Sequence, residues 1–381
     1  MREGWEYKRL GELCDIVMGQ SPMGNSINEN NGIEFHQGKT NFGDKFLMES
    51  GIYTTSPIRI AEKKTILLCV RAPVGIINIT ERQVCIGRGL SSLKPRLGLE
   101  LLYLYYCLLS KQNYFESNST GSTFKAISSK VINNTIIQFP SKSTQLSIVS
   151  ELDKLNELIR IKKEQLKDYD TLAQSIFYEM FGDPVENEKG WEVKKLMEIC
   201  DVRDGTHDSP KYVESSNYML ITSKNIVNRA ISFDDVNYIT EEDYNNINKR
   251  SKVDDGDIIM PMIGTIGNPV IVYLDNLHKF SIKNVALIKF FHNTSILNRY
   301  LLELMISDSF RKYLLSLNKG GTQKFVALGT IRRMDIILPP LSLQQSFAHK
   351  IEQIERQKAA VQSTITDLET LLAARMQYWF D

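Results

Sequence analysis

The sequence has few cysteines and no long uncharged apolar run. Its five cysteines are odd in number and form no Cys-x-x-Cys pair. We therefore expect reduced, buried thiols instead of a disulfide framework or a zinc site. No stretch approaches the roughly 20 apolar residues that a membrane helix needs, and the segment after Met1 lacks the apolar core of a signal peptide. These absences predict a cytoplasmic protein.

Catalytic and cofactor-binding motifs are also missing. There is no G-x-x-x-x-G-K-[ST] loop, no G-x-G-x-x-G and no N-P-P-Y-like methyltransferase tetrapeptide. The five histidines have no metal-ligand spacing. Two acidic segments, Asp183–Pro184 and Asp254–Asp257, are better explained as turns than as nuclease carboxylates. We predict no catalytic residue, no cofactor and no metal site.

The charge is nearly balanced, but it is unevenly distributed. The net charge of +1 gives little support for nucleic-acid binding. Residues 1–142, however, carry 17 Lys and Arg against 12 Asp and Glu, a net charge of +5. Within them, Arg59–Arg96 holds eight basic and two acidic residues. Such a cluster is typical both of a solvated face and of a phosphate-binding surface.

The strongest feature of the sequence is an internal repeat. Trp5–Asp15 returns as Trp191–Asp201, with seven of eleven positions identical. Weaker matches follow in the same order, and Ile136–Pro140 returns as Ile336–Pro340. The offset between the copies only grows along the chain, as expected if the second copy carries extra loop residues. The chain is therefore predicted to contain two related domains.

Each copy ends in a long helix with a heptad seam. Apolar residues alternate in steps of four and three over 148–180 and over 347–379, which is a coiled-coil pattern. We expect N-caps at Ser143 and, through a capping box, at Ser342. Charged residues interrupt the seams at Lys162, Lys358 and Arg375. The apolar seam residues are Ile148, Leu152, Leu155, Ile159, Leu166, Ile176, Phe347, Ile351, Ile354, Val361, Ile365, Leu368 and Leu372.

These patterns predict an α+β protein with two mixed α/β domains and two long helices. Because one chain supplies both helices, we expect them to pair antiparallel within the chain, with a pseudo-two-fold relation between the copies. A coiled coil between separate chains is the alternative. A shorter helix is predicted over Glu100–Ser110, with its counterpart over Leu297–Leu315. The predicted parts are a first domain (1–142), a first helix (143–182), a second domain (183–342) and a second helix (343–381).

At this point the sequence resembles the specificity subunits of type I restriction–modification systems. The resemblance covers essentially the whole chain: tandem copies that open on a tryptophan, carry polar loops and end in a long helix. Phe177–Pro184 is similar to the junction that precedes the family's second recognition domain. Further similar segments are Arg71–Gly75, Cys85–Gly89 and Ile336–Gln344.

The resemblance implies that each globular domain reads one half of a bipartite target on double-stranded DNA. It implies that the helices set the spacer and dock two methyltransferase (modification) subunits, which restriction (translocase/endonuclease) subunits join. The subunit itself would be non-catalytic and bind neither S-adenosylmethionine nor ATP. Because the loops of the two copies have diverged, the two half-sites should differ in sequence.

Polar loop residues are the candidates for DNA contact, since base edges are read by such side chains and phosphates by cations. The predicted base-reading residues are Gln20, Ser21, Lys39, Asn41, Thr206, His207, Ser223, Lys224 and Asn225. The predicted phosphate contacts are Arg71, Arg88, Lys125, Lys283, Lys324, Arg332 and Arg333. His36 is a weaker candidate, because a loop histidine is more often simply solvated. Two alternatives remain at this stage: a recognition subunit of another restriction class, and a non-DNA tandem-repeat scaffold.

Overall fold

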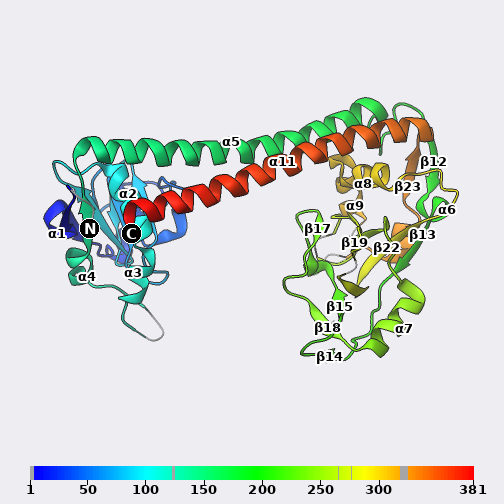
Figure 1. The fold of residues 1–381 in the computed structure, drawn as a ribbon, viewed down its shortest axis with the longest axis horizontal. Coiled ribbons are helices and arrows are strands. Elements are labelled where there is room, and N and C mark those ends of the chain that lie inside the picture. The colour runs from blue at the N-terminus through cyan, green and yellow to red at the C-terminus, as the bar shows by residue number, and fades with distance from the viewer. Residues whose placement is uncertain (1–3, 122–124, 265, 276, 318–324) are drawn as a thin grey trace. The chain divides into compact units, whose positions relative to one another are not determined.

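The computed structural model describes residues 4–121, 125–264, 266–275, 277–317 and 325–381. Contacts divide the chain into two compact units (Figure 1). The first unit is Met1–Lys163 with Ser363–Asp381, and the second is Glu164–Gln362. Within the described residues, no helix is long and apolar enough to cross a membrane.

The first unit is built on a four-stranded antiparallel sheet. In sheet order its strands are β2 (Cys14–Met18), β10 (Leu90–Pro95), β7 (Thr65–Cys69) and β8 (Ile77–Thr80). A five-stranded sheet has the order β3 (Ile27–Asn28), β5 (Tyr53–Thr54), β4 (Ile33–His36), β9 (Val84–Ile86) and β6 (Ile60–Ala61). All residues of β7 and β8 are buried. The apolar run of β7 predicts this, whereas β8 also buries the polar Asn78 and Thr80.

Helices and a two-stranded ribbon complete the first domain. The ribbon pairs β1 (Glu6–Arg9) with β11 (Ile136–Phe139). The helices are α1 (Leu10–Leu13), α2 (Leu101–Ser110), α3 (Gln112–Ser117) and α4 (Ser129–Asn134), with one-turn helices η1 (Gly24–Ser26) and η2 (Lys39–Asn41). Buried residues of α2 join the sheet in one apolar core, which also takes in Ile148, Leu152 and Phe380 from the long helices.

The second unit repeats this plan. Its central sheet has the order β13 (Cys200–Asp204), β22 (Val285–Phe290), β19 (Ile258–Pro261) and β20 (Val270–Ile271), and its ribbon pairs β12 (Glu192–Lys195) with β23 (Asp335–Leu338). The outer sheet is β14 (Tyr212–Val213), β18 (Asn237–Ile239), β15 (Tyr218–Ile221) and β21 (Lys279–Ile282), beside a hairpin of β16 (Ile226–Val227) and β17 (Ala230–Ile231). The helices are α6 (Leu196–Ile199), η3 (Ser223–Asn225), α7 (Glu241–Ser251), α8 (Asn298–Ile306), α9 (Asp308–Ser316) and α10 (Leu328–Arg332).

Matching hydrogen bonds show that the repeat extends to atomic detail. Tyr103 Oη donates to the carbonyl of Gln138 (2.9 Å), and Tyr300 Oη donates to that of Ile337 (2.9 Å). The predicted internal repeat is therefore confirmed in the fold of each unit. The helix predicted over Glu100–Ser110 is α2, whereas the helix predicted over Leu297–Leu315 is interrupted at Ser307 between α8 and α9.

Two buried glutamines fasten the domains to the long helices in the same way. Gln145 Oε1 accepts from the backbone N–H of Glu100 (2.9 Å), and its Nε2 donates to the carbonyls of Gly98 and Pro140 (3.0 Å each). Gln344 accepts from the N–H of Leu297 (2.8 Å) and also donates to two carbonyls. Each glutamine is itself fully buried and gives one N–H and two carbonyls of the neighbouring backbone a hydrogen-bond partner.

The long helices are α5 (Lys142–Phe181) and α11 (Leu341–Phe380), and they pack together antiparallel within each unit. None of the thirteen apolar seam residues is exposed. Two of the charged seam positions are paired between the helices. Lys358 donates to Asp170 in the second unit (2.9 Å), and Arg375 forms an ion pair with Glu151 in the first unit.

The helix starts differ from the predicted caps. Helix α5 begins at Lys142, and Ser141 Oγ accepts from the N–H of Thr144 (3.3 Å), so the cap is Ser141 and not Ser143. Helix α11 begins at Leu341, which places Ser342 inside the helix. In both copies the helix begins within two residues of the proline that follows the ribbon strand, Pro140 or Pro340, and therefore earlier than the serine spacing predicts. The C-terminal stop of α5 is Gly182, whose φ of 75° suits glycine.

Candidate nucleic-acid interface

In the first unit, three polar loops meet at one end of the sheets. Gly19 N–H donates to the carbonyl of Leu90 (2.9 Å), and Gly87 N–H donates to that of His36 (2.8 Å). A Cβ on Gly19 would lie 2.2 Å from the carbonyl oxygen of Gly87. Glycine is therefore required at position 19, because only its backbone can approach the neighbouring loop so closely.

Side chains on these loops form the first loop surface. Ser21 Oγ donates to Gln37 Oε1 (2.8 Å) and accepts from the backbone N–H of Arg88 (3.5 Å). The Ala72 N–H donates to the carbonyl of Lys125 (3.0 Å), which brings a fourth segment to the same edge. The first loop surface comprises Gln20, Ser21, Gln37, Lys39, Arg71, Arg88 and Lys125, all exposed except the half-buried Ser21.

Sequence reasoning missed Gln37. The signal was its position directly after the buried strand β4 and before Gly38, where a strand delivers its next side chain to a loop. The predicted residue Asn41 is half-buried, and its amide donates to the carbonyl of Glu49 (3.0 Å). Asn41 therefore serves to hold the loop.

His36 is buried in an ion-pair network and is not part of the surface. Its Nε2 lies 3.0 Å from Glu34 Oε1, and Arg82 donates to both carboxylate oxygens of Glu34 (2.5 and 2.8 Å). Burial opposes ionisation of Glu34, but hydrogen bonds from Arg82 and from the N–H of Ser50 lower its pKa to about 2. Burial lowers the pKa of His36. Arg82 also donates to two carbonyls of the segment after η2, so the network fixes that segment.

The second unit builds its loops with the same backbone contacts. Gly205 N–H donates to the carbonyl of Val285 (3.0 Å), and Thr206 N–H donates to that of Ile282 (3.0 Å). A Cβ on Gly205 would lie 2.3 Å from the Ile282 carbonyl oxygen. Gly205 is therefore the counterpart of Gly19, and the loop that follows carries different side chains.

His207 links this loop to the turn at Asn284 and to the end of β13. Its Nδ1 lies 3.0 Å from Asn284 Oδ1 and its Nε2 lies 2.7 Å from Asp204 Oδ2. Hydrogen bonds to Asn284 and to Asp204 raise the pKa of His207, because both ring nitrogens face acceptor oxygens. Asp204 also forms an ion pair with Arg250 of α7. The second loop surface comprises Thr206, His207, Ser223, Lys224, Arg250, Lys283 and Asn284; Arg250 and Asn284 were missed by sequence reasoning.

Three further predicted residues in this unit are engaged within the fold. Asn225 is only 6% exposed, and its side chain accepts from Thr222 and donates to the carbonyl of Asp235 (2.9 Å). Arg332 donates through Nε and Nη2 to the carbonyl of Val202 (2.9 and 2.8 Å). Lys283 Nζ donates to Ser209 Oγ (3.0 Å). Asn225 therefore caps η3 and is not a candidate for base contact.

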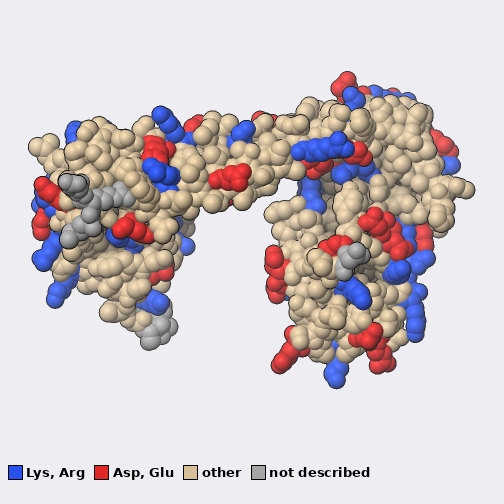
Figure 2. All heavy atoms as spheres, in the orientation of Figure 1, with Lys and Arg blue, Asp and Glu red and all other residues tan. Residues whose placement is uncertain are grey.

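The remaining predicted phosphate contacts are less constrained. Arg333 is exposed at the end of α10, and Lys324 lies outside the described residues. On the face in view, Figure 2 shows basic and acidic side chains interspersed over both units. Among the described residues, no group of three His, Cys, Asp or Glu side chains could hold a metal ion.

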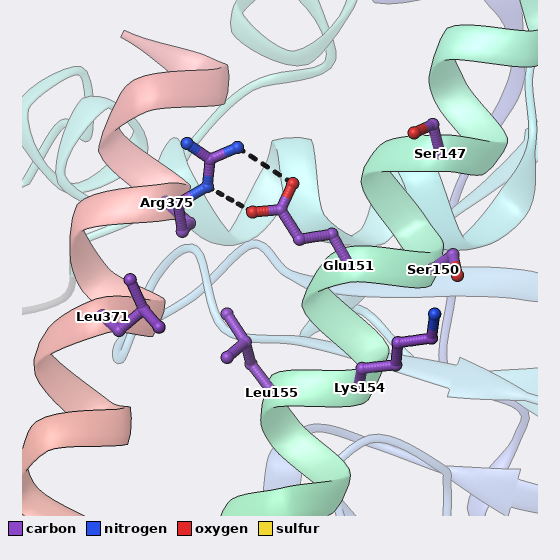
Figure 3. Close-up of a pocket in the computed structure, with 7 residues that line it drawn as sticks. All are labelled: Ser147, Ser150, Glu151, Lys154, Leu155, Leu371 and Arg375. Atoms are coloured by element: carbon purple, nitrogen blue, oxygen red, sulfur yellow. Dashed lines mark hydrogen bonds and ion pairs between the residues drawn. The ribbon is translucent and has the colours of Figure 1, made fainter.

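The helix pair presents a second kind of surface in the first unit. Figure 3 shows Glu151 of α5 and Arg375 of α11 pointing toward one another across the helices, beside Leu155 and Leu371. The hydrogen bond from Arg375 lowers the pKa of Glu151, and Trp379 Nε1 donates to the same carboxylate (3.1 Å). These polar contacts select one register of the two helices, since an apolar seam alone would tolerate a shift.

Comparisons with known proteins agree with this architecture. The type I restriction modification DNA specificity domain matches residues 2–168 and again 188–370. The MjaIX specificity subunit of a type I restriction enzyme from Methanocaldococcus jannaschii is 26% identical over 92% of this chain and 86% of its own length. The MjaX specificity subunit of that organism is 34% identical over 46% of this chain, although the match spans only 42% of that relative.

Solved structures share the fold. The S subunit of a type I restriction–modification system from M. genitalium has a TM-score of 0.54, at 16% identity over 99% of this chain and 96% of its own. A chain from a structural study of type I complex assembly and conformational transition has a TM-score of 0.65, at 18% identity over 100% and 98%.

Two copies of the domain, each followed by a long helix, define a tandem target-recognition architecture. The chain belongs to the family of type I restriction–modification DNA specificity subunits.

Proposed function

We propose that this chain reads an asymmetric, bipartite sequence on double-stranded DNA, with one half-site for each globular domain. The observation that carries the proposal is the shared backbone geometry at Gly19 and Gly205. The same loop construction presents Gln20, Ser21 and Arg88 in one unit and different side chains in the other. If the two domains approach the duplex in the same way but carry different side chains, they select two different half-sites.

The two loop surfaces supply the groups for such reading. Amide, hydroxyl and imidazole side chains contact base edges, and the cations on the same loops contact the flanking phosphates. In the first domain, Arg71, Arg88 and Lys125 supply the positive charge. In the second, Lys283 does so, and Arg333 at the end of α10 is a further candidate. The weak net charge of +1 implies that partner subunits supply part of the phosphate grip.

The long helices provide the frame for assembly. They set the separation of the half-sites and dock two methyltransferase subunits, to which restriction subunits bind. The chain itself contributes recognition and not catalysis, and it binds no cofactor. Its five cysteines are all buried and unpaired, which suits a protein that works on DNA in the reducing cytoplasm.

Co-expression with the methyltransferase subunit, followed by genome-wide mapping of methylated adenines, tests the proposal. The expected result is one motif of two unlike half-sites separated by an unread spacer of constant length. A continuous motif, a palindrome, or no sequence-dependent methylation would contradict it. Binding of the assembled complex to duplex DNA should also weaken steeply as salt rises.

A further inference from the structure

Helix α7 (Glu241–Ser251) is an addition to the second domain. It lies between β18 and β19, whereas the equivalent stretch of the first domain, between β5 and β7, carries only the short strand β6. Thr240 caps its start by accepting from the N–H of Asp243 (3.1 Å). Acidic residues occupy its first turn and Lys249 and Arg250 its last, as the helix dipole favours. The helix is thus well specified, and its last turn lies against the loop after β13.

The last turn of α7 holds Arg250 in a fixed position. Asp204, whose side chain is 13% exposed, pairs with Arg250 through Oδ1 and with His207 through Oδ2. The guanidinium of Arg203 donates to the backbone carbonyl of Arg250 (2.9 Å), which anchors the helix end itself. The Arg250 side chain is nevertheless 62% exposed. One guanidinium nitrogen is therefore anchored, while most of the group faces solvent.

On the side of Arg250 that faces Thr206 and Asp243, the surroundings suit a base edge better than a phosphate. The hollow on its other side is lined by Lys249 and Arg332 as well as by Asp201. A pocket of about 300 Å³ on the first side is lined by Thr206, Asp208, Ser209, Asp243 and Asn246, among others. The carboxylates of Asp208 and Asp243 in its lining repel a phosphate, and a carboxylate can accept a hydrogen bond from the exocyclic amino group of a base. A fixed guanidinium offers the paired donors that match the O6 and N7 atoms of guanine.

We propose that Arg250 is the specificity-determining residue that reads a guanine in the half-site of the second domain, and that Asp204 and His207 are its positioning residues. In the first domain, the backbone equivalent of Asn284 is Arg88, because Gly87 and Lys283 occupy corresponding hydrogen-bonded positions. Each domain thus has an arginine beside the loop that starts at Gly19 or Gly205. In the first domain this is Arg88, on a turn, and in the second it is Arg250, on the added helix α7. This inference rests on the proposed function.

The test uses the complete complex of this chain with its methyltransferase. Methylation rates are measured on duplexes that carry the mapped motif and on duplexes in which each guanine–cytosine pair of the second half-site is replaced in turn. For one pair, R250A should reduce the discrimination between the motif and the replaced duplex by about 5- to 150-fold. R250K should reduce this discrimination by a similar factor, because lysine keeps the charge but lacks the paired donors.

Matched variants separate reading from charge and from folding. K252A removes a cation near the same helix end, outside both loop surfaces, and should leave the base preference unchanged. D204N should weaken the discrimination less than R250A, and D204E should restore part of it if Asp204 acts by positioning. If the R250A chain does not assemble with the methyltransferase, the discrimination measured with R250K tests the proposal by itself.

The outcomes also distinguish this inference from the proposed function. Unchanged discrimination at every pair of the second half-site in R250K would overturn the role of Arg250, even if wild type reads a bipartite motif. A wild-type complex that shows no bipartite motif would overturn the proposed function instead. A loss of discrimination in the first half-site as well would show that Arg250 acts on assembly, and would also overturn the inference.

Discussion

The two domains share a frame but differ in how they present their reading side chains. Both place a glycine where the loop after the first sheet strand contacts a neighbouring backbone, and both fasten α2 or α8 to a long helix through a buried glutamine. The first domain then carries Arg88 on a turn between two glycines. The second carries Asn284 at the equivalent position, and the inserted helix α7 supplies Arg250 beside the loop after β13.

This difference shows where such a domain can change its specificity. The frame contacts use backbone groups and buried side chains, so a change there costs stability in either copy. The loop surfaces consist of exposed side chains, so they can diverge without disturbing the core. Equivalent mutations of the frame should therefore destabilise the two domains equally. Mutations of the loop surfaces should affect the two half-sites differently.

The largest effect is expected from adding a Cβ at Gly19 or Gly205, where the backbone lies very close to a neighbouring carbonyl. Gly19→Ala and Gly205→Ala each place a methyl group within 2.3 Å of a backbone carbonyl oxygen. Each should lower the free energy of unfolding of its own domain by about 3 kcal/mol, measured by chemical denaturation. Gly24→Ala is the control, since nothing lies within 4 Å of its added Cβ. Stability equal to wild type in either variant would refute the required backbone contact.

A somewhat smaller effect is expected from the paired glutamines. Gln145→Ala and Gln344→Ala each leave one N–H and two carbonyls without their buried partner. The loss should be about 2 kcal/mol in each domain. Denaturation of both variants checks whether the two losses agree. A large loss in one domain and none in the other would break the equivalence of the frames.

The smallest effect concerns pH, and it should appear in one domain only. The groups facing His207 are Asp204 of β13, Asn284 and Arg250 of α7, and hydrogen bonds to the first two raise its pKa. Its imidazolium charge is complete below the ordinary value of about 6.5 and is lost as pH rises through the raised pKa. Affinity for the second half-site should therefore fall a few-fold on going from about pH 6.5 to 8.5.

The first domain supplies the control for this prediction. Burial lowers the pKa of His36, so this group loses its proton at a lower pH than an ordinary histidine, whereas His207 loses its proton at a higher pH. In duplexes with one half-site scrambled, only binding through the second half-site should depend on pH, and His207→Gln should remove the dependence. An equal slope for both half-sites would contradict the assignment to His207.

The frame could be predicted from the sequence because its signals are local and repeated. The match of Trp5–Asp15 with Trp191–Asp201 and the two heptad seams required no knowledge of tertiary contacts. The caps at Ser143 and Ser342 were wrong because several serines and prolines stand close together at each helix start. Which residue caps the helix depends on where the preceding strand ends, and that is decided by backbone geometry that cannot be read from the sequence.

The candidate surface was harder to predict, since polarity alone does not distinguish a reading residue from a structural one. Asn225 and Ser223 are neighbours in one polar loop, yet Asn225 is turned inward to cap η3. Arg250 stands some 40 residues from the loop that it joins, on a helix whose polar sequence resembles any solvated helix. Its position depends on the pairing with Asp204, a contact that no spacing rule anticipates.

Exchange of the first domain tests the central claim most directly. Residues 1–142, which we propose as the first recognition domain, would be replaced by the corresponding domain of another family member, and the methylated motif mapped in the assembled complex. The account predicts that one half of the motif changes while the other half stays the same. A change in both halves, or in neither, would contradict it.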